Sequence, residues 1–311
     1  MSTLLRVSPI PYQGSKRKLA AAIVGCFPEE FPRLYEPFVG SAAVTLATAG
    51  LRPEVSLSLN DTNAALVALW QEIIERPDEI AAQYSLLWHE QLDRPRDFYD
   101  EMRDEFNATG RPDLFLYLLA RCVKAAVRYN ARGEFNQSPD NRRLGSKPQR
   151  MTRNIAGASR LLRGRTSVTA LDFTEAVADA TPHDLIYMDP PYQGVSSNRD
   201  RRYADVLAYD VFVAALVEFN RRDLSYIISY DGRMGDKTYG KPLPETLLLK
   251  HYEIDAGRST QSTLAGGDAR TIESIYLSPA LVDRLGGAPD ALRGSQPQAH
   301  RPGADQGLPS R

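Results

Sequence analysis

The tetrapeptide Asp189-Pro190-Pro191-Tyr192 follows a short apolar run, residues 184–188, that predicts a buried strand. Two consecutive prolines cannot continue a sheet ladder, and they hold the chain extended and stiff. The strand is therefore expected to end in a rigid platform that offers a carboxylate, a backbone carbonyl and an aromatic ring. Open α/β sheets bind ligands at this end of their strands. The platform suits an exocyclic amine on a flat heterocycle, although a simple proline turn at a strand exit also explains it.

Other apolar runs predict further strands, and helical patterns separate several of them. This alternation favours an α/β fold with a doubly wound, mostly parallel sheet. Strands are predicted at 34–38, 55–59, 168–171, 185–188, 226–229, 247–250 and 272–277, and helices at 64–75, 78–88, 97–106, 114–127 and 211–220. About a hundred residues separate the second strand from the third, and they hold mainly helices and then a polar, arginine-rich stretch, 128–165. A sheet with a helical insert fits this pattern.

The domain organisation follows from these elements. We expect one domain formed by residues 1–62 and 164–282, interrupted by a helical, basic insert at 63–163. Residues 283–311 are predicted to be a disordered tail, because 286–311 contains 5 Gly and 4 Pro in 26 residues and no aromatic residue.

Charge is distributed unevenly along a chain whose net charge is only −1. Residues 51–110 contain 5 Lys/Arg and 13 Asp/Glu, whereas residues 121–170 contain 12 Lys/Arg and 2 Asp/Glu. A basic segment inside a neutral protein is typical of a phosphate-contacting surface. A solvated basic face that binds nothing would have the same composition.

Several classes of protein are disfavoured by composition. No apolar run approaches the ~20 residues that span a bilayer, and residues 1–20 contain no signal-peptide core. The only cysteines are Cys26 and Cys122, and the four histidines lack metal-ligand spacing. We expect a cytoplasmic protein without a membrane segment or a structural metal.

Polar and small residues follow three other predicted strands. Residues 35–41 end the first strand with Glu36, Phe38 and Gly40, where small residues let a ligand approach the backbone. Asp61 follows the second strand and could accept hydrogen bonds from a ribose, or Asn60 or Asp61 could cap the next helix. Asp172 and Phe173 follow the third strand and could hold an adenine, or Asp172 could be a cap.

Two loops complete the set of candidate sites. Residues 12–17 form a glycine-containing polar loop whose Lys16 could close over a carboxylate, although a solvated loop is equally plausible. Residues 128–136 follow a helix in the basic segment and combine Arg and Asn, which read base edges, with aromatic rings that stack on bases. A helix C-terminus leading to a polar hairpin would explain the glycine of this run, but not its concentration of base-reading residues.

Together these motifs resemble the Dam-type DNA adenine-N6 methyltransferases of the α group, in which the cofactor half precedes the target-recognition insert and the catalytic strand. The resemblance spans residues 12–279 and depends on the order and spacing of the motifs. It implies a Rossmann-like methyltransferase sheet, S-adenosylmethionine as cofactor and double-stranded DNA as partner. A cognate restriction endonuclease is a candidate partner, and a monomer is expected.

The resemblance also implies residue roles. Asp189 and the Pro190 carbonyl, on the platform with Pro191, would bind N6 of a flipped-out adenine, and Tyr192 would stack on that base. Asp61 would hold the cofactor ribose, and Asp172 and Phe173 its adenine. The remaining cofactor residues would be Tyr12, Gly14, Lys16, Glu36, Phe38 and Gly40, and the DNA contacts would be Lys124, Arg128, Asn130, Arg132 and Asn136.

Departures from the family pattern and rival functions remain open. Ala42 stands where the family has a second glycine, which we expect to be tolerated if the backbone there is helical. Residues 257–263 are a candidate second DNA-contacting loop. The rivals are an RNA adenine-N6 methyltransferase, a DNA cytosine-N4 methyltransferase and a non-catalytic DNA-binding relative.

Overall fold

The structure is a computed structural model that describes residues 7–191, 207–234, 237–239, 242–258, 270–287 and 289. At 231–234, 237–239, 255–258, 270 and 271 it describes the backbone alone.

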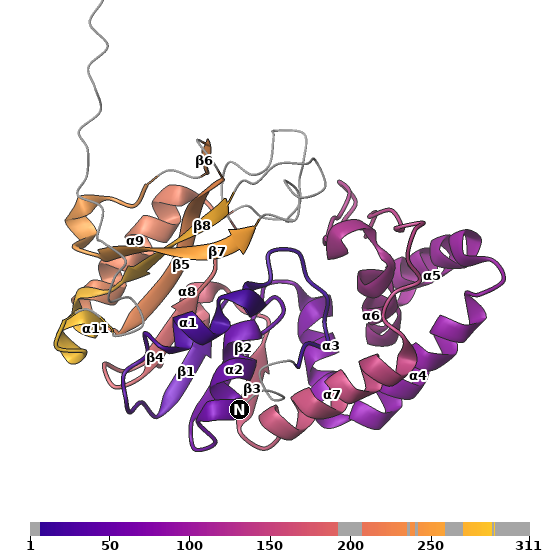
Figure 1. The fold of residues 1–311 in the computed structure, drawn as a ribbon, viewed down its shortest axis with the longest axis horizontal. Helices are drawn as coiled ribbons and strands as arrows, with labels where there is room; N and C mark the ends of the chain where they lie inside the picture. Colours follow the sequence, from indigo (N-terminus) through magenta and orange to yellow (C-terminus); the bar gives the residue numbers. More distant parts are fainter. Residues whose placement is uncertain are drawn as a thin grey trace, which may run out of the picture.

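One eight-stranded sheet runs through the structure in the order β3-β2-β1-β4-β5-β8-β7, with β6 beside β5 (Figure 1). The pairs that join β3, β2, β1, β4 and β5 are parallel, whereas β8 pairs antiparallel with β5 and β7. The predicted mostly parallel, Rossmann-like sheet is therefore confirmed. The strands are β1 (Arg33–Glu36), β2 (Ser56–Asn60), β3 (Thr166–Thr169), β4 (Leu185–Met188), β5 (Tyr226–Met234), β6 (Lys237–Tyr239), β7 (Lys250–Arg258) and β8 (Arg270–Leu277).

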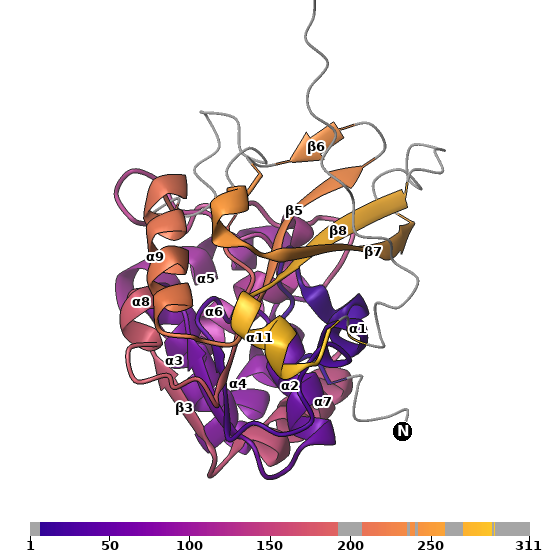
Figure 2. The same ribbon diagram turned by 90° about the vertical axis from the view of Figure 1, so that its left-hand side faces the viewer.

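Helices cover both faces of the sheet, with α8 and α9 on one face and α1 and α2 on the other (Figure 2). Side chains alternate between the faces, so Leu185 and Tyr187 pack with α1 and α2, whereas Ile186 and Met188 pack with α9. The helices and single helical turns outside the β2–β3 connection are η2 (Lys16–Lys18), α1 (Ala20–Val24), α2 (Ala43–Leu51), α8 (Phe173–Ala176), α9 (Tyr209–Arg221), η4 (Glu245–Leu247) and α11 (Pro279–Arg284).

The connection from β2 to β3 is a layer of helices beside the sheet (Figure 1). Its elements are α3 (Ala64–Glu75), α4 (Pro77–Glu90), α5 (Pro95–Thr109), α6 (Pro112–Arg121), η3 (Val123–Ala125) and α7 (Pro148–Leu162). Proline begins α4, α5, α6 and α7, where its missing N–H costs no helical hydrogen bond. Arg121 is 2% exposed, and its guanidinium donates to the carbonyls of Pro95, Asp140 and Arg143.

Three predicted elements were wrong in extent or type. Helix α7 lies in the stretch we expected to be only polar and arginine-rich. The helix predicted at 114–127 ends at Arg121, because Cys122 is extended at φ −73° and ψ 159°. Beyond it, Lys124 and Ala125 adopt left-handed φ values of 60° and 50°. The strand predicted at 247–250 overlaps β7 only at Lys250, since Leu248 is left-handed at φ 54°.

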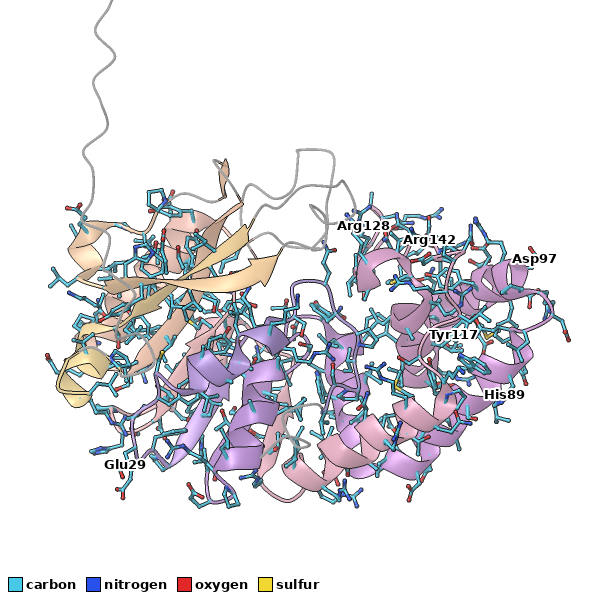
Figure 3. All side chains as sticks on the ribbon, in the orientation of Figure 1. Glu29, His89, Asp97, Tyr117, Arg128 and Arg142 are labelled. Atoms are coloured by element: carbon cyan, nitrogen blue, oxygen red, sulfur yellow. The ribbon has the colours of Figure 1, made fainter. Side chains whose placement is uncertain are left out.

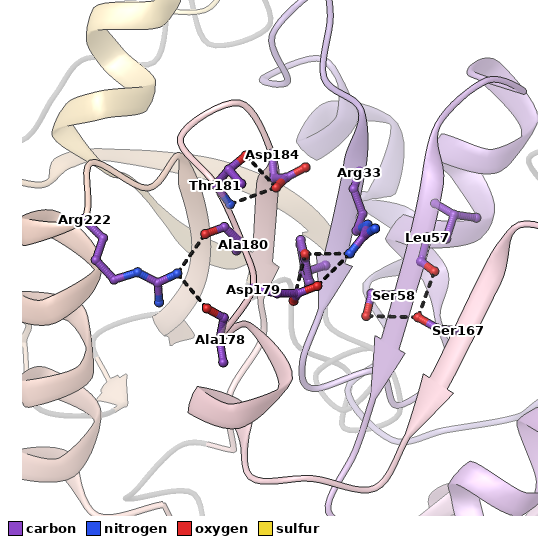
Figure 4. Close-up of polar contacts among 11 residues, drawn as sticks. Arg33, Leu57, Ser58, Ser167, Ala178, Asp179, Ala180, Thr181, Asp184 and Arg222 are labelled. Atoms are coloured by element: carbon purple, nitrogen blue, oxygen red, sulfur yellow. Dashed lines mark hydrogen bonds and ion pairs between the residues drawn. The ribbon is translucent and has the colours of Figure 1, made fainter.

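The amino edge of the sheet is closed by polar contacts between connections (Figure 4). Arg33, at the start of β1, forms a 2.9 Å ion pair with Asp179. Arg222 donates to the carbonyls of Ala178 and Ala180 at 3.0 and 2.8 Å. The predicted ligand-binding residues lie at the other edge. No helix in the described ranges is long and apolar enough to cross a membrane.

Candidate active site at the carboxyl edge of the sheet

Asn60 joins three strand ends at the carboxyl edge. Its amide nitrogen donates to the carbonyls of Pro37 and Leu171 at 3.2 and 3.0 Å, and its oxygen accepts from the Leu171 N–H at 2.8 Å. Asn60 is 1% exposed, so these bonds replace all of its contact with water. The chain segments after β1, β2 and β3 are thereby held together.

Asp61 presents a carboxylate beside this junction. Its oxygens accept from the backbone N–H of Gly40 at 3.3 Å and of Asn63 at 3.0 Å. Burial raises the pKa of Asp61, and the two N–H donors oppose that rise. The alternative that Asn60 or Asp61 caps the next helix is wrong, because the Asn63 side chain caps α3. The Asp61 carboxylate thus retains lone pairs for a ligand.

The turn between β1 and α2 is left-handed at two residues. Gly40 has φ +43°, and a Cβ there would lie 3.2 Å from the Tyr12 ring, so this ring covers bare backbone. The condition we set for Ala42 is not met, because its φ of 49° and ψ of 34° are left-handed and not those of a right-handed helix.

Glu36 supplies the helix cap that Ala42 cannot. Its Oε2 accepts from the Thr45 N–H at 3.0 Å and from the Thr45 hydroxyl, at the first turn of α2. Glu36 is 3% exposed, and burial raises its pKa to about 8, against the effect of the Thr45 hydrogen bonds. Glu36 is therefore largely protonated at neutral pH.

Aromatic rings line the edge between β1 and β3. Phe38 is half-buried and stacks on Phe173, with ring centroids 5.4 Å apart. Phe173 is only 2% exposed, so a flat ligand would meet Phe38 first. Asp172 is exposed and accepts from the Thr174 N–H at 2.9 Å, as the cap of α8.

Asp189 and Lys16 meet at the end of β4. Lys16 Nζ lies 3.0 Å from Asp189 Oδ1 and 3.5 Å from Glu273 Oε2. Burial works against the charge on Lys16, but the carboxylates of Asp189 and Glu273 raise the pKa of its ammonium well above the usual range. The loop that carries Lys16 is tied to the turn before α2 by a 2.7 Å hydrogen bond between Ser15 and Ser41.

The Pro190 carbonyl is the second acceptor at this point. Pro190 is buried, and none of the described residues donates a hydrogen bond to its carbonyl. Below it, Tyr187 is 1% exposed and its hydroxyl lies 2.9 Å from Ser229 Oγ. The end of β4 therefore offers a carboxylate and a carbonyl on a rigid base.

Glu273 was missed by the sequence reasoning. It lies on β8, two strands from β4, and its side chain is 19% exposed. The available signal was a single acidic residue inside the apolar run predicted as a strand at 272–277.

The DNA-contact candidates lie in a hairpin that closes on itself. Asn130 accepts from the N–H groups of Arg132 and Glu134 at 2.8 and 3.0 Å, and donates to Glu134 Oε2 at 2.7 Å. Arg132 and Asn136 are exposed, and Arg128 is half-buried. Lys124 is exposed on the strained turn next to Ala125, whose carbonyl accepts from the Gln13 N–H at 3.0 Å.

The basic segment 121–170 does not form one positive surface. Arg128 and Arg142 lie at the top of Figure 3, whereas α7 lies at the bottom of the same view in Figure 1. Arg163 and Arg165 donate to backbone carbonyls at the ends of α3 and α2. Only part of the charge counted in the sequence therefore faces the candidate site.

Some predictions fall on residues outside the described ranges. Tyr192 lies there, as do residues 259–263 of the candidate second loop and most of the tail after 287. Within the described ranges, no group of three or more His, Cys, Asp or Glu side chains could hold a metal ion.

The carboxyl-edge residues fit a nucleoside-linked methyl donor such as S-adenosylmethionine. Asp61 offers a carboxylate that no helix uses as a cap, and at Gly40 the missing Cβ lets the Tyr12 ring close over the backbone beside it. Phe38 presents a half-buried ring for a flat base.

Comparison with known proteins agrees with this geometry. A family model described as D12 class N6 adenine-specific DNA methyltransferase matches residues 12–259. A DNA adenine methylase of Serratia marcescens is 32% identical over 168 residues, which are 53% of this chain and 59% of that protein. The retron Ec67 DNA adenine methylase of Escherichia coli is 30% identical over 203 residues, 63% of this chain and 66% of its own.

A more distant relative carries a different name. The type II methyltransferase M1.LlaDCHI of Lactococcus lactis subsp. cremoris is 25% identical over 191 residues, which are 58% of this chain and 64% of that protein. The chain thus spans less than two thirds of the length of each of these relatives.

Proposed function

Because this chain belongs to the D12 class of N6-adenine-specific DNA methyltransferases, we propose that it transfers a methyl group from S-adenosylmethionine to adenine N6 in duplex DNA. The observation that carries the proposal is the end of β4, where Asp189 and the Pro190 carbonyl are adjacent acceptors on a rigid proline platform. An adenine amine has two hydrogens, one for each acceptor.

The residues of the chain act by positioning and electrostatics. The lone pair of adenine N6 is delocalised into the ring, so the amine is a poor nucleophile. Asp189 and the Pro190 carbonyl accept its hydrogens and favour a more tetrahedral nitrogen whose lone pair is available. S-adenosylmethionine, when bound, supplies a methyl group made electrophilic by its sulfonium. Flipping the base out of the duplex costs a few kcal/mol, and stacking on Tyr192 would return about 1–3 kcal/mol.

The remaining residues would hold the two substrates. We assign Asp61 to the cofactor ribose, and Phe38, Asp172 and Phe173 to its adenine. Its methionine part would lie among Tyr12, Gly14, Glu36 and Gly40, while Lys16 would act on Asp189. DNA would contact Lys124, Arg128, Asn130, Arg132 and Asn136, with the phosphate contacts positioning the protein and base contacts setting its target.

The context of the reaction is also part of the proposal. We expect a monomeric, cytoplasmic enzyme. A relative named a type II methyltransferase supports a cognate restriction endonuclease as a partner. DNA modified by this enzyme would then resist that endonuclease.

The test is transfer of a labelled methyl group from S-adenosylmethionine to unmethylated duplex DNA and, in parallel, to RNA. Asp189→Ala should fold, bind cofactor and lose methylation by roughly 10²-fold or more. Asp179→Ala is the matched control, because Asp179 also forms an ion pair with a basic residue but lies at the amino edge. Sequencing the modified positions identifies the target site. Label in RNA alone, or on cytosine N4, would show that adenine N6 in duplex DNA is not the substrate. Retained turnover in Asp189→Ala would refute the role of Asp189.

A further inference from the structure

Glu273 reaches the active site from a part of the chain that the family match does not cover. The match ends at residue 259, whereas Glu273 lies on β8, opposite Gly232 of β5 and Ile254 of β7. Its Oε2 is 3.5 Å from Lys16 Nζ, and its side chain is 19% exposed. Glu273 therefore contacts the residue that pairs with Asp189.

Five ionisable groups gather at this point. Burial raises the pKa of Glu273, and nearby Asp189 raises it further, whereas Lys16 opposes the rise. The charge of Asp189 also acts on Glu36, whose pKa is about 8, and on the buried Tyr187. The five groups are Lys16 on η2, Glu36 on β1, Tyr187 and Asp189 at β4, and Glu273 on β8. Among the described residues Lys16 is the only cation of this group, so its position affects how strongly Asp189 is neutralised.

We propose that Glu273 is a positioning residue that shares the Lys16 ammonium with Asp189. An ammonium has three N–H donors on a flexible stem, and one carboxylate fixes only its distance. A second anchor at 3.5 Å also fixes its direction. A shared cation withdraws less charge from Asp189 than an exclusive one, so Asp189 stays a stronger acceptor for the adenine amine. This inference rests on the proposed function.

The experiment is a double-substitution cycle with Glu273→Gln and Lys16→Met in the full chain. Glu273→Gln should lower kcat roughly tenfold to a hundredfold, while KM for S-adenosylmethionine and for DNA stays within about threefold, because the proposed function assigns Glu273 to neither substrate. In the Lys16→Met background Glu273→Gln should cause no further loss, since Glu273 acts through Lys16. Additive losses, or an unchanged kcat in Glu273→Gln, would overturn the proposal.

Glu253→Gln is the matched control. Glu253 lies on the adjacent strand β7 and pairs with Ser274, so its side chain leaves the opposite face of the sheet from Glu273. Its substitution should leave kcat within about twofold of wild type. An equal loss in Glu253→Gln would show that any acidic residue in these strands matters, and it would also overturn the proposal.

Urea unfolding of the same four proteins gives a readout independent of turnover. The shifts in unfolding midpoint should be non-additive, which establishes that Glu273 and Lys16 interact; additive shifts would contradict the shared ion pair. If wild type fails to methylate DNA, the proposed function fails while this cycle still reports on the ion pair. If Glu273→Gln prevents folding, Glu273→Asp takes its place, because it keeps the charge but moves it away from Lys16. Losses of kcat in Glu273→Asp and Lys16→Met that add up in the double variant would likewise overturn the proposal.

Discussion

The hydroxyl of Tyr129 donates a 3.3 Å hydrogen bond to Oδ1 of Asn63. Tyr129 belongs to the hairpin of the insert, and Asn63 caps α3 and donates its N–H to Asp61. One hydrogen bond thus connects the candidate DNA-contacting hairpin to the turn that carries Asp61, the residue proposed to bind the cofactor ribose.

Tyr129→Phe should weaken the coupling between cofactor and DNA binding. The ring still packs on Phe135, but the hydrogen bond, worth about 1 kcal/mol, is lost. In wild type we expect DNA affinity to rise when S-adenosylhomocysteine, the cofactor after loss of its methyl group, is bound, and in Tyr129→Phe we expect this rise to fall roughly fivefold. Fluorescence anisotropy with and without this product measures it. Tyr84→Phe, which loses a hydroxyl bond to the Ser146 carbonyl inside the insert, should leave the coupling intact; equal effects in both variants would argue against the connection.

Glu36 should make stability depend on pH. Its pKa is about 8 in the folded chain and ordinary in the unfolded chain. Below about pH 4.5 Glu36 is protonated in both the folded and the unfolded chain, so it does not lower the free energy of unfolding there. Between that pH and about 8 only the unfolded chain loses the proton, so stability falls as pH rises.

Glu36→Gln should remove this dependence, because an amide does not titrate and its oxygen can still accept from the Thr45 N–H. Relative to Glu36→Gln, wild type should lose up to about 1.4 kcal/mol of unfolding free energy per pH unit across the window. Urea titrations at pH 5, 6, 7 and 8 measure the difference. Parallel curves for the two proteins would rule out a buried, protonated Glu36.

Glu134→Gln should strengthen DNA binding. Glu134 pairs with Arg132 at 2.7 Å and so occupies a guanidinium that phosphate would need. Removing its charge frees Arg132, while the amide oxygen can still accept from Asn130. We expect roughly threefold to tenfold tighter binding at low salt and a steeper salt dependence. Glu218→Gln removes a similar partner, that of Arg221 on α9, and should not change DNA affinity. An equal gain in affinity in Glu218→Gln would mean that any loss of negative charge tightens binding, and would contradict the specific role of Arg132.

Leu248→Gly should stabilise the chain. Leu248 is 76% exposed and left-handed at φ 54°, where a side chain strains the backbone. Relief of strain should exceed the little packing lost, and raise the unfolding free energy by about 0.5–1 kcal/mol. Leu86→Gly, at a 63% exposed position within helix α4, should destabilise by about 1 kcal/mol. Loss of stability in both variants would contradict the strain at Leu248.

The strands were predictable where burial alone decides the pattern. The run 185–188 was predicted with its observed bounds, because a central parallel strand is buried on both faces. Helix α7 was missed because its outer face is rich in Arg, Gln and Thr, although Met151, Ile155 and Leu162 recur at helical spacing and are buried. The end of α6 was not predictable, since Lys124 and Ala125 are of good helix-forming types, yet Cys122 is extended and both of these residues are left-handed.

The candidate site, like the fold, could be predicted from the sequence only in part. The ends of parallel strands meet at one edge whatever their order, so Asp61, Asp172 and Asp189 could be placed together from the sequence. Which groups their side chains contact depends on the three-dimensional path of other segments. The Lys16–Glu273 contact joins a loop before β1 to a strand near the end of the chain, and no local pattern encodes it.

Parallel pairing of β2 with β3 has a consequence for how such enzymes can diversify. The chain leaves β2 at the carboxyl edge and must return to the amino edge before β3 begins. Helix α7, with 15 residues and so about 22 Å long, makes that return against α3 and α4. Residues 122–147 project outside this path and meet the catalytic half through the Gln13–Ala125 and Tyr129–Asn63 hydrogen bonds. The residues that we propose to contact DNA can therefore change in evolution without altering the strand ends that we propose to bind the two substrates.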